Sequence, residues 1–147
     1  MPIPELINGM LPAGVWDCSL ADIEARFGGF DRTQTRRELC RHLKAYLEEA
    51  RGVGLIRAVC VDGSFVTDKP EPNDLDIIVS LASDQDENAE LRPFEYNATS
   101  KRSIRRRYKF DVAIVKEGSP QEQESLAFFA LVRERPGDRK GLLRIIP

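Results

Sequence analysis

Three aspartates have a type and spacing that could do chemistry. Asp74 and Asp76 occur in the segment DLDI, and Asp111 occurs in the later segment FDV. Side chains two residues apart on a β-strand point to the same face, so Asp74 and Asp76 are predicted to project together. If the strand of Asp111 lies beside theirs, the three carboxylates converge and repel one another. A divalent cation would relieve that repulsion, and all-oxygen ligands suit Mg²⁺ or Mn²⁺.

A Gly-Ser pair precedes the aspartates and offers groups that suit a phosphate. Gly63 leaves room for a phosphate to approach the backbone closely. The Ser64 hydroxyl and nearby amides can donate to phosphate oxygens. Nine residues separate Ser64 from Asp74. Lys69, in this intervening loop, could neutralise phosphate charge, although a solvated loop lysine is the simpler interpretation.

Each candidate also has an ordinary structural interpretation. The DLDI aspartates could begin a strand whose polar face meets water, and Asp111 could occupy an exposed position on an edge strand. Ser64 could be a simple turn residue. Taken singly, these interpretations are adequate. The ordered combination of Gly-Ser, Asp-apolar-Asp and a third aspartate favours a metal and phosphate site.

In this order the motifs resemble the nucleotidyltransferase superfamily built on the palm of DNA polymerase β. Its signature is an apolar strand, Gly-Ser, Asp-apolar-Asp after a short loop, and a third Asp on a later strand. The matching stretches here, within about residues 55–115, are AVCVDGS, DLDI and FDV. The resemblance implies that Gly63 and Ser64 hold a nucleoside triphosphate (NTP). It also implies that the three aspartates bind two metal ions, Mg²⁺ or Mn²⁺, and that Asp111 helps to activate the attacking hydroxyl.

The resemblance also implies a fold and a reaction. The fold would be α+β, with a palm-like mixed sheet flanked by helices. The reaction would move a nucleoside monophosphate from an NTP to a hydroxyl or phosphate acceptor, such as RNA or a partner protein. Transfer would be untemplated, because the residues outside the predicted palm are too few to build fingers or a thumb. The chain looks most like small stand-alone bacterial members, many of them linked to toxin–antitoxin or defence systems.

One departure from that pattern keeps other functions open. The commonest minimal members carry GSxARG, whereas this chain reads GSFVTD. The basic side chain is therefore absent, unless Lys69 or the basic segment 101–107 replaces it. One alternative is a non-catalytic palm that binds nucleotide or a partner protein, as an antitoxin or regulator. Another is a plain phosphate-binding or RNA-binding domain that uses 101–107.

Hydrophobic periodicity predicts the elements that position these residues. N-terminal helices are expected within 19–51, with Ser19 and Asp22 forming a capping box at the start of the first. A further helix is expected within 99–107 and a C-terminal helix at about 119–132. Residues 1–18, rich in Pro and Gly, are expected to be irregular. Strands are predicted at 55–61, 74–81 and 109–115, with an edge strand at 141–146.

Composition bounds the class of protein. With 147 residues, 41% hydrophobic content and 31% charged content, the chain is expected to form one soluble domain over 1–147. A net charge of −2 excludes a global basic field. Three cysteines without a CxxC pair favour reduced thiols in a cytoplasmic protein. The N-terminus lacks a signal peptide pattern, and no apolar run suggests a membrane span.

The segment KRSIRRRYK (101–109) is the main basic cluster of the chain. It could be a solvated helix face or a contact surface for phosphate or RNA that leads into the Asp111 strand. His42 is the only histidine. Its place on a helix, far in sequence from the aspartates, favours a structural role over a catalytic one.

Overall fold

The computed structural model describes residues 3–28, 34–69, 72, 75–84, 90–132 and 137–147. Its centre is a five-stranded sheet in the order β1-β5-β2-β3-β4. Helices pack against this sheet, so the predicted α+β class is confirmed. The strands are β1 (Val15–Asp17), β2 (Ile56–Asp62), β3 (Asp76–Leu81), β4 (Asp111–Lys116) and β5 (Leu142–Ile145).

The sheet is mixed, and its central pairing sets the site. Strand β2 is antiparallel to both β3 and β5, whereas β4 runs parallel to β3 and β1 runs parallel to β5. The predicted strands that carry DLDI and FDV are therefore neighbours. Because β3 and β4 are parallel, their first residues meet at the same end of the sheet, where β2, running the other way, ends.

Two predictions about strands were wrong. The 141–146 segment was predicted at an edge, but β5 lies between β1 and β2. Leu142, Leu143 and Ile145 are all buried, a near-continuous apolar run that is typical of an interior strand. Part of the 1–18 segment, predicted to be irregular, forms the edge strand β1. All three of its residues are exposed, so it lacks the alternation that signals a strand.

The helices largely match the predicted ranges. They are α1 (Leu20–Phe27), α2 (Gln34–Val53), α3 (Pro93–Thr99), α4 (Lys101–Tyr108) and α5 (Pro120–Phe129). Ser19 caps α1 and forms the predicted capping box with Asp22. Ser100 ends α3 and caps α4, so the basic segment makes a helix of its own. Helix α5 ends earlier than predicted, and Leu131 instead bridges to Arg139.

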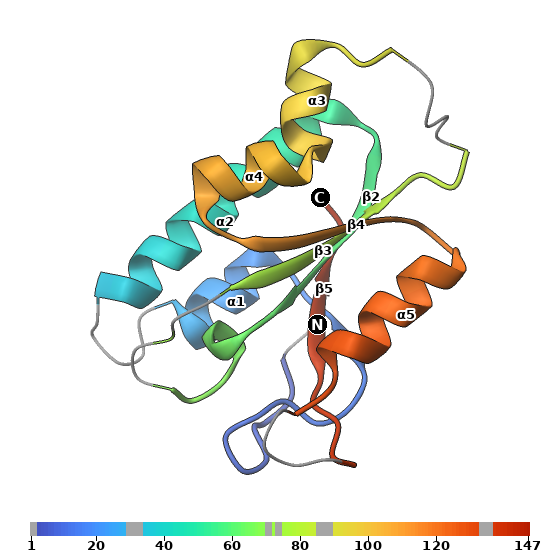
Figure 1. Ribbon diagram of the computed structural model, residues 1–147. Helices are drawn as coiled ribbons and strands as arrows, with labels where there is room; N and C mark the ends of the chain where they lie inside the picture. The colour runs from blue at the N-terminus through green and yellow to red at the C-terminus, as the bar shows by residue number, and fades with distance from the viewer. Residues whose placement is uncertain (1–2, 29–33, 70–71, 73–74, 85–89, 133–136) are drawn as a thin grey trace.

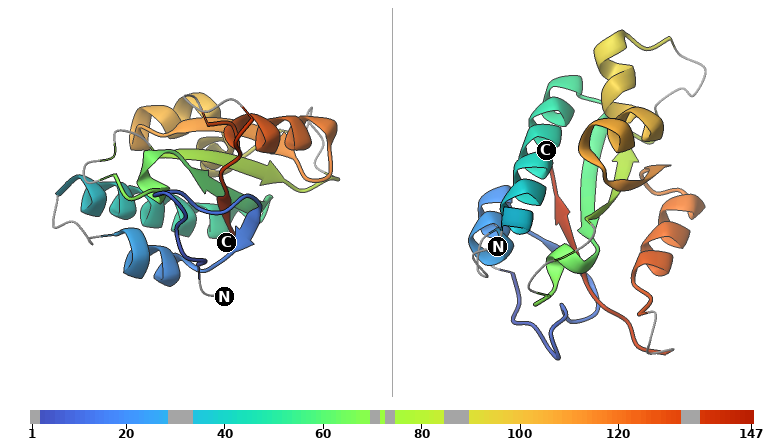
Figure 2. Two further views of the ribbon diagram at one scale, coloured as in Figure 1. Left: turned by 90° about the horizontal axis from the view of Figure 1, so that it is seen from below. Right: turned by 60° about the vertical axis from the view of Figure 1, so that its left-hand side comes forward.

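Helices cover both faces of the sheet (Figure 1). Helices α1 to α4 lie on one face, with the long α2 running beside the strands, and α5 lies on the other face (Figures 1 and 2). The larger apolar cluster, which includes Leu43, Val59 and Ile77, fills the α2 face. A smaller cluster, which includes Cys60 and Ile78, fills the α5 face. Alternate residues of β2 and β3 therefore belong to different cores.

Within the described residues, no helix combines the length and the apolar character that crossing a bilayer requires. Cys18, Cys40 and Cys60 are free thiols. Burial raises the pKa of Cys18 and of Cys40 to about 11. It raises the pKa of Cys60 to about 12, so at neutral pH these thiols stay protonated and are poor nucleophiles.

Candidate functional site

The turn after β2 places Gly63 and Ser64 at the end of the sheet. Gly63 has φ 92°, a conformation that favours glycine. The chain then makes one turn of 3-10 helix, Ser64–Val66, closed by a hydrogen bond of 3.2 Å from the Val66 amide to the Gly63 carbonyl. Phe65 and Val66 are buried. The positive φ of Gly63 thus gives a second reason for glycine at this position, besides the room for a phosphate that was predicted from the sequence.

A buried arginine of α2, which was not among the site residues predicted from the sequence, fixes the loop that follows. Arg36 is fully buried. Its Nη1 donates to the carbonyl oxygens of Phe27 at 3.1 Å and Phe65 at 2.7 Å. Its Nη2 donates to those of Thr67 at 2.8 Å and Lys69 at 2.6 Å. A guanidinium presents several donors in a fixed plane, so one side chain sets the path of residues 65–69.

Asp76 and Asp111 come together as predicted. They are the first residues of β3 and β4 and are register partners in that parallel pair. Side chains of register partners point to the same face, here the face of α5, as the alternation with Ile78 shows. The Asp111 side chain is 61% exposed, and its Oδ1 lies 3.7 Å from Nη2 of Arg105. Two carboxylates therefore share one end of the sheet.

The other predicted site residues have different outcomes. Asp74 lies outside the described residues, so its predicted place beside Asp76 stays a prediction. Lys69 is exposed in the loop. Its carbonyl accepts from Arg36, and its amide donates to Thr67 Oγ1 at 3.2 Å. Hydrogen bonds thus fix the backbone of Lys69, whereas its side chain is exposed, which agrees with the interpretation as a solvated loop lysine.

A further carboxylate, Asp62, belongs to the same end of the sheet and was missed. It is the last residue of β2, and it is the register partner of Asp76 in the antiparallel pair β2–β3. Asp62, Asp76 and Asp111 thus form a row across three strands on one face, called here the acid row. Asp62 is almost completely buried, and its Oδ1 lies 3.3 Å from Nζ of Lys140. An acidic residue at the end of the buried run AVCVD was the available signal.

The acid row runs across three neighbouring strands at one end of the sheet. Neighbouring strands lie ~4.8 Å apart, so the row spans about 10 Å from first to last backbone position. Among the described residues, no three or more His, Cys, Asp or Glu side chains are grouped to hold one metal ion. The adjacent pair Asp76 and Asp111 offers carboxylate oxygens, which Mg²⁺ and Mn²⁺ prefer. The donor chemistry of that pair therefore fits the predicted cation, with Asp74 as the predicted additional ligand.

One arginine of the basic cluster has a structural role. Arg107 donates to both carboxylate oxygens of Glu49 at 2.8 Å, and the Tyr108 hydroxyl donates to the same carboxylate at 2.7 Å. Burial tends to raise the pKa of Glu49, but these hydrogen bonds outweigh it and leave that pKa below its ordinary value. Arg107 therefore joins α4 to α2. Arg102, Arg105 and Arg106 are exposed.

The single histidine packs among aromatic rings. The ring centre of His42 lies 6.3 Å from that of Tyr108 and 6.5 Å from that of Phe110. These rings belong to the α2 face of the sheet, because Phe110 and Tyr108 pack with the larger core. The acid row lies on the opposite face. The predicted structural role of His42 agrees with this placement.

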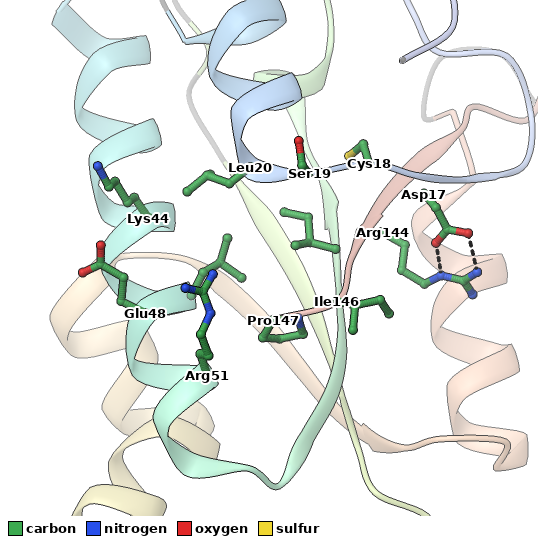
Figure 3. Close-up of a pocket in the computed structure, with 12 residues that line it drawn as sticks. Asp17, Cys18, Ser19, Leu20, Lys44, Glu48, Arg51, Arg144, Ile146 and Pro147 are labelled. Atoms are coloured by element: carbon green, nitrogen blue, oxygen red, sulfur yellow. Dashed lines mark hydrogen bonds and ion pairs between the residues drawn. The ribbon is translucent and has the colours of Figure 1, made fainter. Parts of the chain in front are cut away.

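One hollow among the described residues has no residue of the acid row in its lining. It is a cavity of about 380 Å³ between α2, the start of α1 and the residues that follow β5 (Figure 3). Lys44, Glu48 and Arg51 of α2 line one side, and Arg144 on the other side pairs with Asp17 at 2.6 Å (Figure 3). A second hollow of about 310 Å³ is lined by residues 7, 8 and 10–13 together with Asp138 and Arg139, which precede Lys140 in the chain.

Comparison with known proteins places the chain by family only. Residues 4–146 match a family described as a family of unknown function, DUF6932. The chain belongs to that family. No curated protein matches the chain. No solved structure matches it either. Evidence for the function of this DUF6932 protein therefore comes from its own residues.

Proposed function

We propose that this chain is a nucleotidyltransferase of the DNA polymerase β-like superfamily, dependent on Mg²⁺ or Mn²⁺. One observation carries the proposal: Asp76 and Asp111 are register partners at the start of parallel strands. The strand on the other side of β3 ends directly in Gly63-Ser64. A palm-like site needs these groups at one end of one sheet. The sequence motifs, the parallel pairing and the shared face all favour that arrangement.

The reaction would transfer a nucleoside monophosphate. An acceptor oxygen forms a bond to the α-phosphorus of the NTP, the bond from that phosphorus to the α,β-bridging oxygen breaks, and pyrophosphate leaves. The acceptor hydroxyl loses its proton, and Asp111 would help to remove it, as the resemblance implies. Its exposure to solvent would let an acceptor reach it. Asp76, on the neighbouring strand β3, would help to orient the reacting groups.

The metal would be held by carboxylates of this chain. Asp76 and Asp111, with Asp74, would be its ligands. When bound, the cation would lower the pKa of the acceptor hydroxyl and stabilise the charge on the triphosphate. Without a cation, adjacent carboxylates repel each other at this end of the sheet.

The triphosphate would lie beside the turn after β2. Gly63 and Ser64 are proposed to hold it, as the resemblance implies. The loop behind them is held by four hydrogen bonds from the buried Arg36. A turn fixed in this way would be pre-organised, so little ordering would be required when the nucleotide binds.

The acceptor is proposed to be RNA or a partner protein, and transfer to be untemplated. The described helices lie against the sheet, with α1 to α4 on one face and α5 on the other. Helix α4, which leads into Asp111, presents three exposed arginines, Arg102, Arg105 and Arg106. A polynucleotide bound there would have its end close to Asp111. The proposed cellular setting, a bacterial toxin–antitoxin or defence system in the cytoplasm, rests on the resemblance alone.

The proposal can be tested with labelled nucleotides. The protein is incubated with each α-labelled NTP, with Mg²⁺ or Mn²⁺, and with a total cell lysate. We expect a labelled acceptor with the wild type, and loss of the label by about 10³-fold with Asp111→Asn or Asp76→Asn, because several kcal/mol of stabilisation are removed. Labelling that is equal in wild type and variants would contradict the proposal. Preference among the four NTPs should be modest, at ~1–3 kcal/mol.

One observation favours a second function, a non-catalytic palm that binds nucleotide or a partner protein. In the related motif GSxARG the basic residue corresponds to position 67, which is threonine here. The Thr67 hydroxyl donates to the Ser64 carbonyl at 2.6 Å, so this side chain is turned onto the loop itself. Binding of NTP without any labelled acceptor would support this alternative, in which the protein acts as an antitoxin or regulator.

A further inference from the structure

Lys140 is a cation set into the end of the sheet that carries the acid row. Its side chain is only 19% exposed, and its Nζ lies 3.3 Å from Oδ1 of Asp62, which is 2% exposed. Its backbone amide is held by the carbonyl of Ala130 at 2.9 Å. Lys140 and Leu142 are two residues apart, and Leu142 packs in the core on the α5 face. The ammonium group therefore reaches the acid row from the segment just before β5, the strand that pairs with β2.

The acid row has a cation at each end, and the two cations differ. Arg105 lies 3.7 Å from Asp111 at one end, and its side chain is 66% exposed. Lys140 contacts Asp62 at the other end and is largely buried. A buried charge is costly unless it is well paired. Replacing Lys140 and Asp62 by two apolar residues would have avoided that cost, so the pair has no obvious reason in stability alone.

The position of Lys140 within the row suggests which ligand group it meets. Asp62 directly precedes Gly63 and Ser64, the residues proposed to hold the triphosphate. Arg105 is at the opposite end, next to Asp111, where the acceptor is proposed to bind. The lysine thus lies on the phosphate side of the row. A lysine ammonium has three donors, so contact with Asp62 leaves donors for a second anion.

We propose that Lys140 binds the β- and γ-phosphates of the NTP and stabilises the leaving pyrophosphate, with Asp62 as the residue that positions it. This inference rests on the proposed nucleotidyltransferase function. It also gives the chain a cation for the triphosphate, a role that Thr67, turned onto the Ser64 carbonyl, cannot fill. Lys69 is the rival for the same role, but its side chain is exposed in the loop.

The test compares ligands that differ only in their phosphates. Binding of ATP, AMP and inorganic tripolyphosphate, each with Mg²⁺, is measured by calorimetry for the wild type and Lys140→Gln. We expect affinity for ATP and for tripolyphosphate to fall by about 10- to 100-fold, the cost of one lost charge-assisted hydrogen bond. Affinity for AMP, which lacks the β- and γ-phosphates, should stay within about twofold. Lys140→Arg, which keeps the charge, should recover part of the loss.

Two controls separate phosphate binding from a structural role. Lys69→Gln and Arg139→Gln remove two other exposed cations, one in the loop after β2 and one adjacent to Lys140 in the sequence, and both variants should bind ATP as the wild type does. Lys140→Gln leaves Asp62 buried beside a neutral group, so the double variant Asp62→Asn with Lys140→Gln is measured as well. If this double variant folds and still discriminates ATP from AMP as the wild type does, the proposal for Lys140 is overturned. Equal weakening of ATP and AMP binding would also overturn it, because that result indicates a structural role.

Failure of this inference can be told from failure of the proposed function. If the wild type binds ATP and labels an acceptor, and Lys140→Gln does both equally well, only the role of Lys140 is wrong. If the wild type binds neither ATP nor tripolyphosphate, the nucleotidyltransferase proposal fails and this inference fails with it. Loss of tripolyphosphate binding in Lys140→Gln, in a wild type that labels nothing, would support the lysine in a non-catalytic palm.

Discussion

The two faces of the sheet treat charged side chains differently. On the α2 face, charges come with their partners: Arg36 donates to four carbonyl oxygens, and Glu49 accepts from Arg107 and Tyr108. On the α5 face, the acid row places like charges on three neighbouring strands. Like charges directly opposite each other destabilise a sheet. The first arrangement stabilises the fold, whereas repulsion between neighbouring carboxylates opposes it in the second, although Lys140 and Arg105 lie beside the two ends of the row.

The largest effect expected on the paired side is that of Arg36. Arg36→Met should destabilise the protein by about 3 kcal/mol or more, because four carbonyl oxygens, two of them in buried hydrogen bonds, would lose their donor. Urea unfolding followed by circular dichroism measures the change. Arg41→Met, at an exposed position of the same helix, is the matched control and should change stability by less than ~0.5 kcal/mol. A similarly small change in stability for both variants would show that the hydrogen bonds of Arg36 do not stabilise the fold.

The Glu49 network should have an intermediate effect that depends on pH. Glu49→Gln should cost about 1.5–3 kcal/mol at neutral pH, since charge-assisted hydrogen bonds are lost. The pKa of Glu49 is lower in the folded protein than its ordinary value of 4.5. The stabilisation is therefore present above that ordinary value and is lost as the pH falls through the folded-state pKa.

Urea midpoints at several pH values check this sign. The difference between wild type and Glu49→Gln should be widest at neutral pH and should narrow below about pH 4. Arg106→Gln, at the exposed residue beside Arg107, serves as the control and should show a small difference that does not vary over this range. A difference for Glu49→Gln that grows in acid would mean that the carboxylate is not stabilised in its charged form.

Substitutions in the acid row should not destabilise the protein, in contrast to those at Arg36 and Glu49. Asp76→Asn with Asp111→Asn should leave stability without metal unchanged, or raise it by up to ~1 kcal/mol, because repulsion between neighbouring carboxylates is relieved. Mg²⁺ with ATP should raise the melting temperature of the wild type by ligand linkage and should not raise that of the variant. Melting curves with and without Mg²⁺ and ATP test both points. Strong destabilisation of this variant would mean that Asp76 and Asp111 stabilise the fold, as the paired charges on the α2 face do.

The sequence was sufficient for the features that depend on local pattern. The Ser19 capping box, the apolar stripe of α2 and the alternation that puts Asp76 and Asp111 on one face follow from short-range spacing. Arg36 could also have been found. It lies four residues before Cys40 and seven before Leu43, on the apolar stripe itself, where a charged residue implies a buried partner.

The remaining features depend on contacts between distant segments. Asp62 joins the acid row through its register with Asp76, and the motif spacing alone does not give that register. Lys140 reaches Asp62 because β5 lies beside β2, whereas the segment was predicted at an edge. The exposed strand β1 has no alternation of polar and apolar residues to reveal it. These features follow from chain topology, which short-range patterns constrain only weakly.

The smallest effect concerns the basic helix α4, and it refines the comparison within one element. Arg107 belongs to the paired charges, but Arg102, Arg105 and Arg106 are exposed on the helix that leads to Asp111. If these three contact a single-stranded RNA acceptor, replacing all three by Gln should reduce the slope of log affinity against log salt by about 2, at ~0.7 per phosphate contact. Folding should be unaffected, because Arg107 still joins α4 to α2. A triple replacement at the exposed Arg37, Arg41 and Lys44 of α2 is the matched control and should leave the slope unchanged. If the slope is also unchanged for the α4 variant, these three arginines do not contact RNA and form a solvated helix face. That result would favour a partner protein as the acceptor.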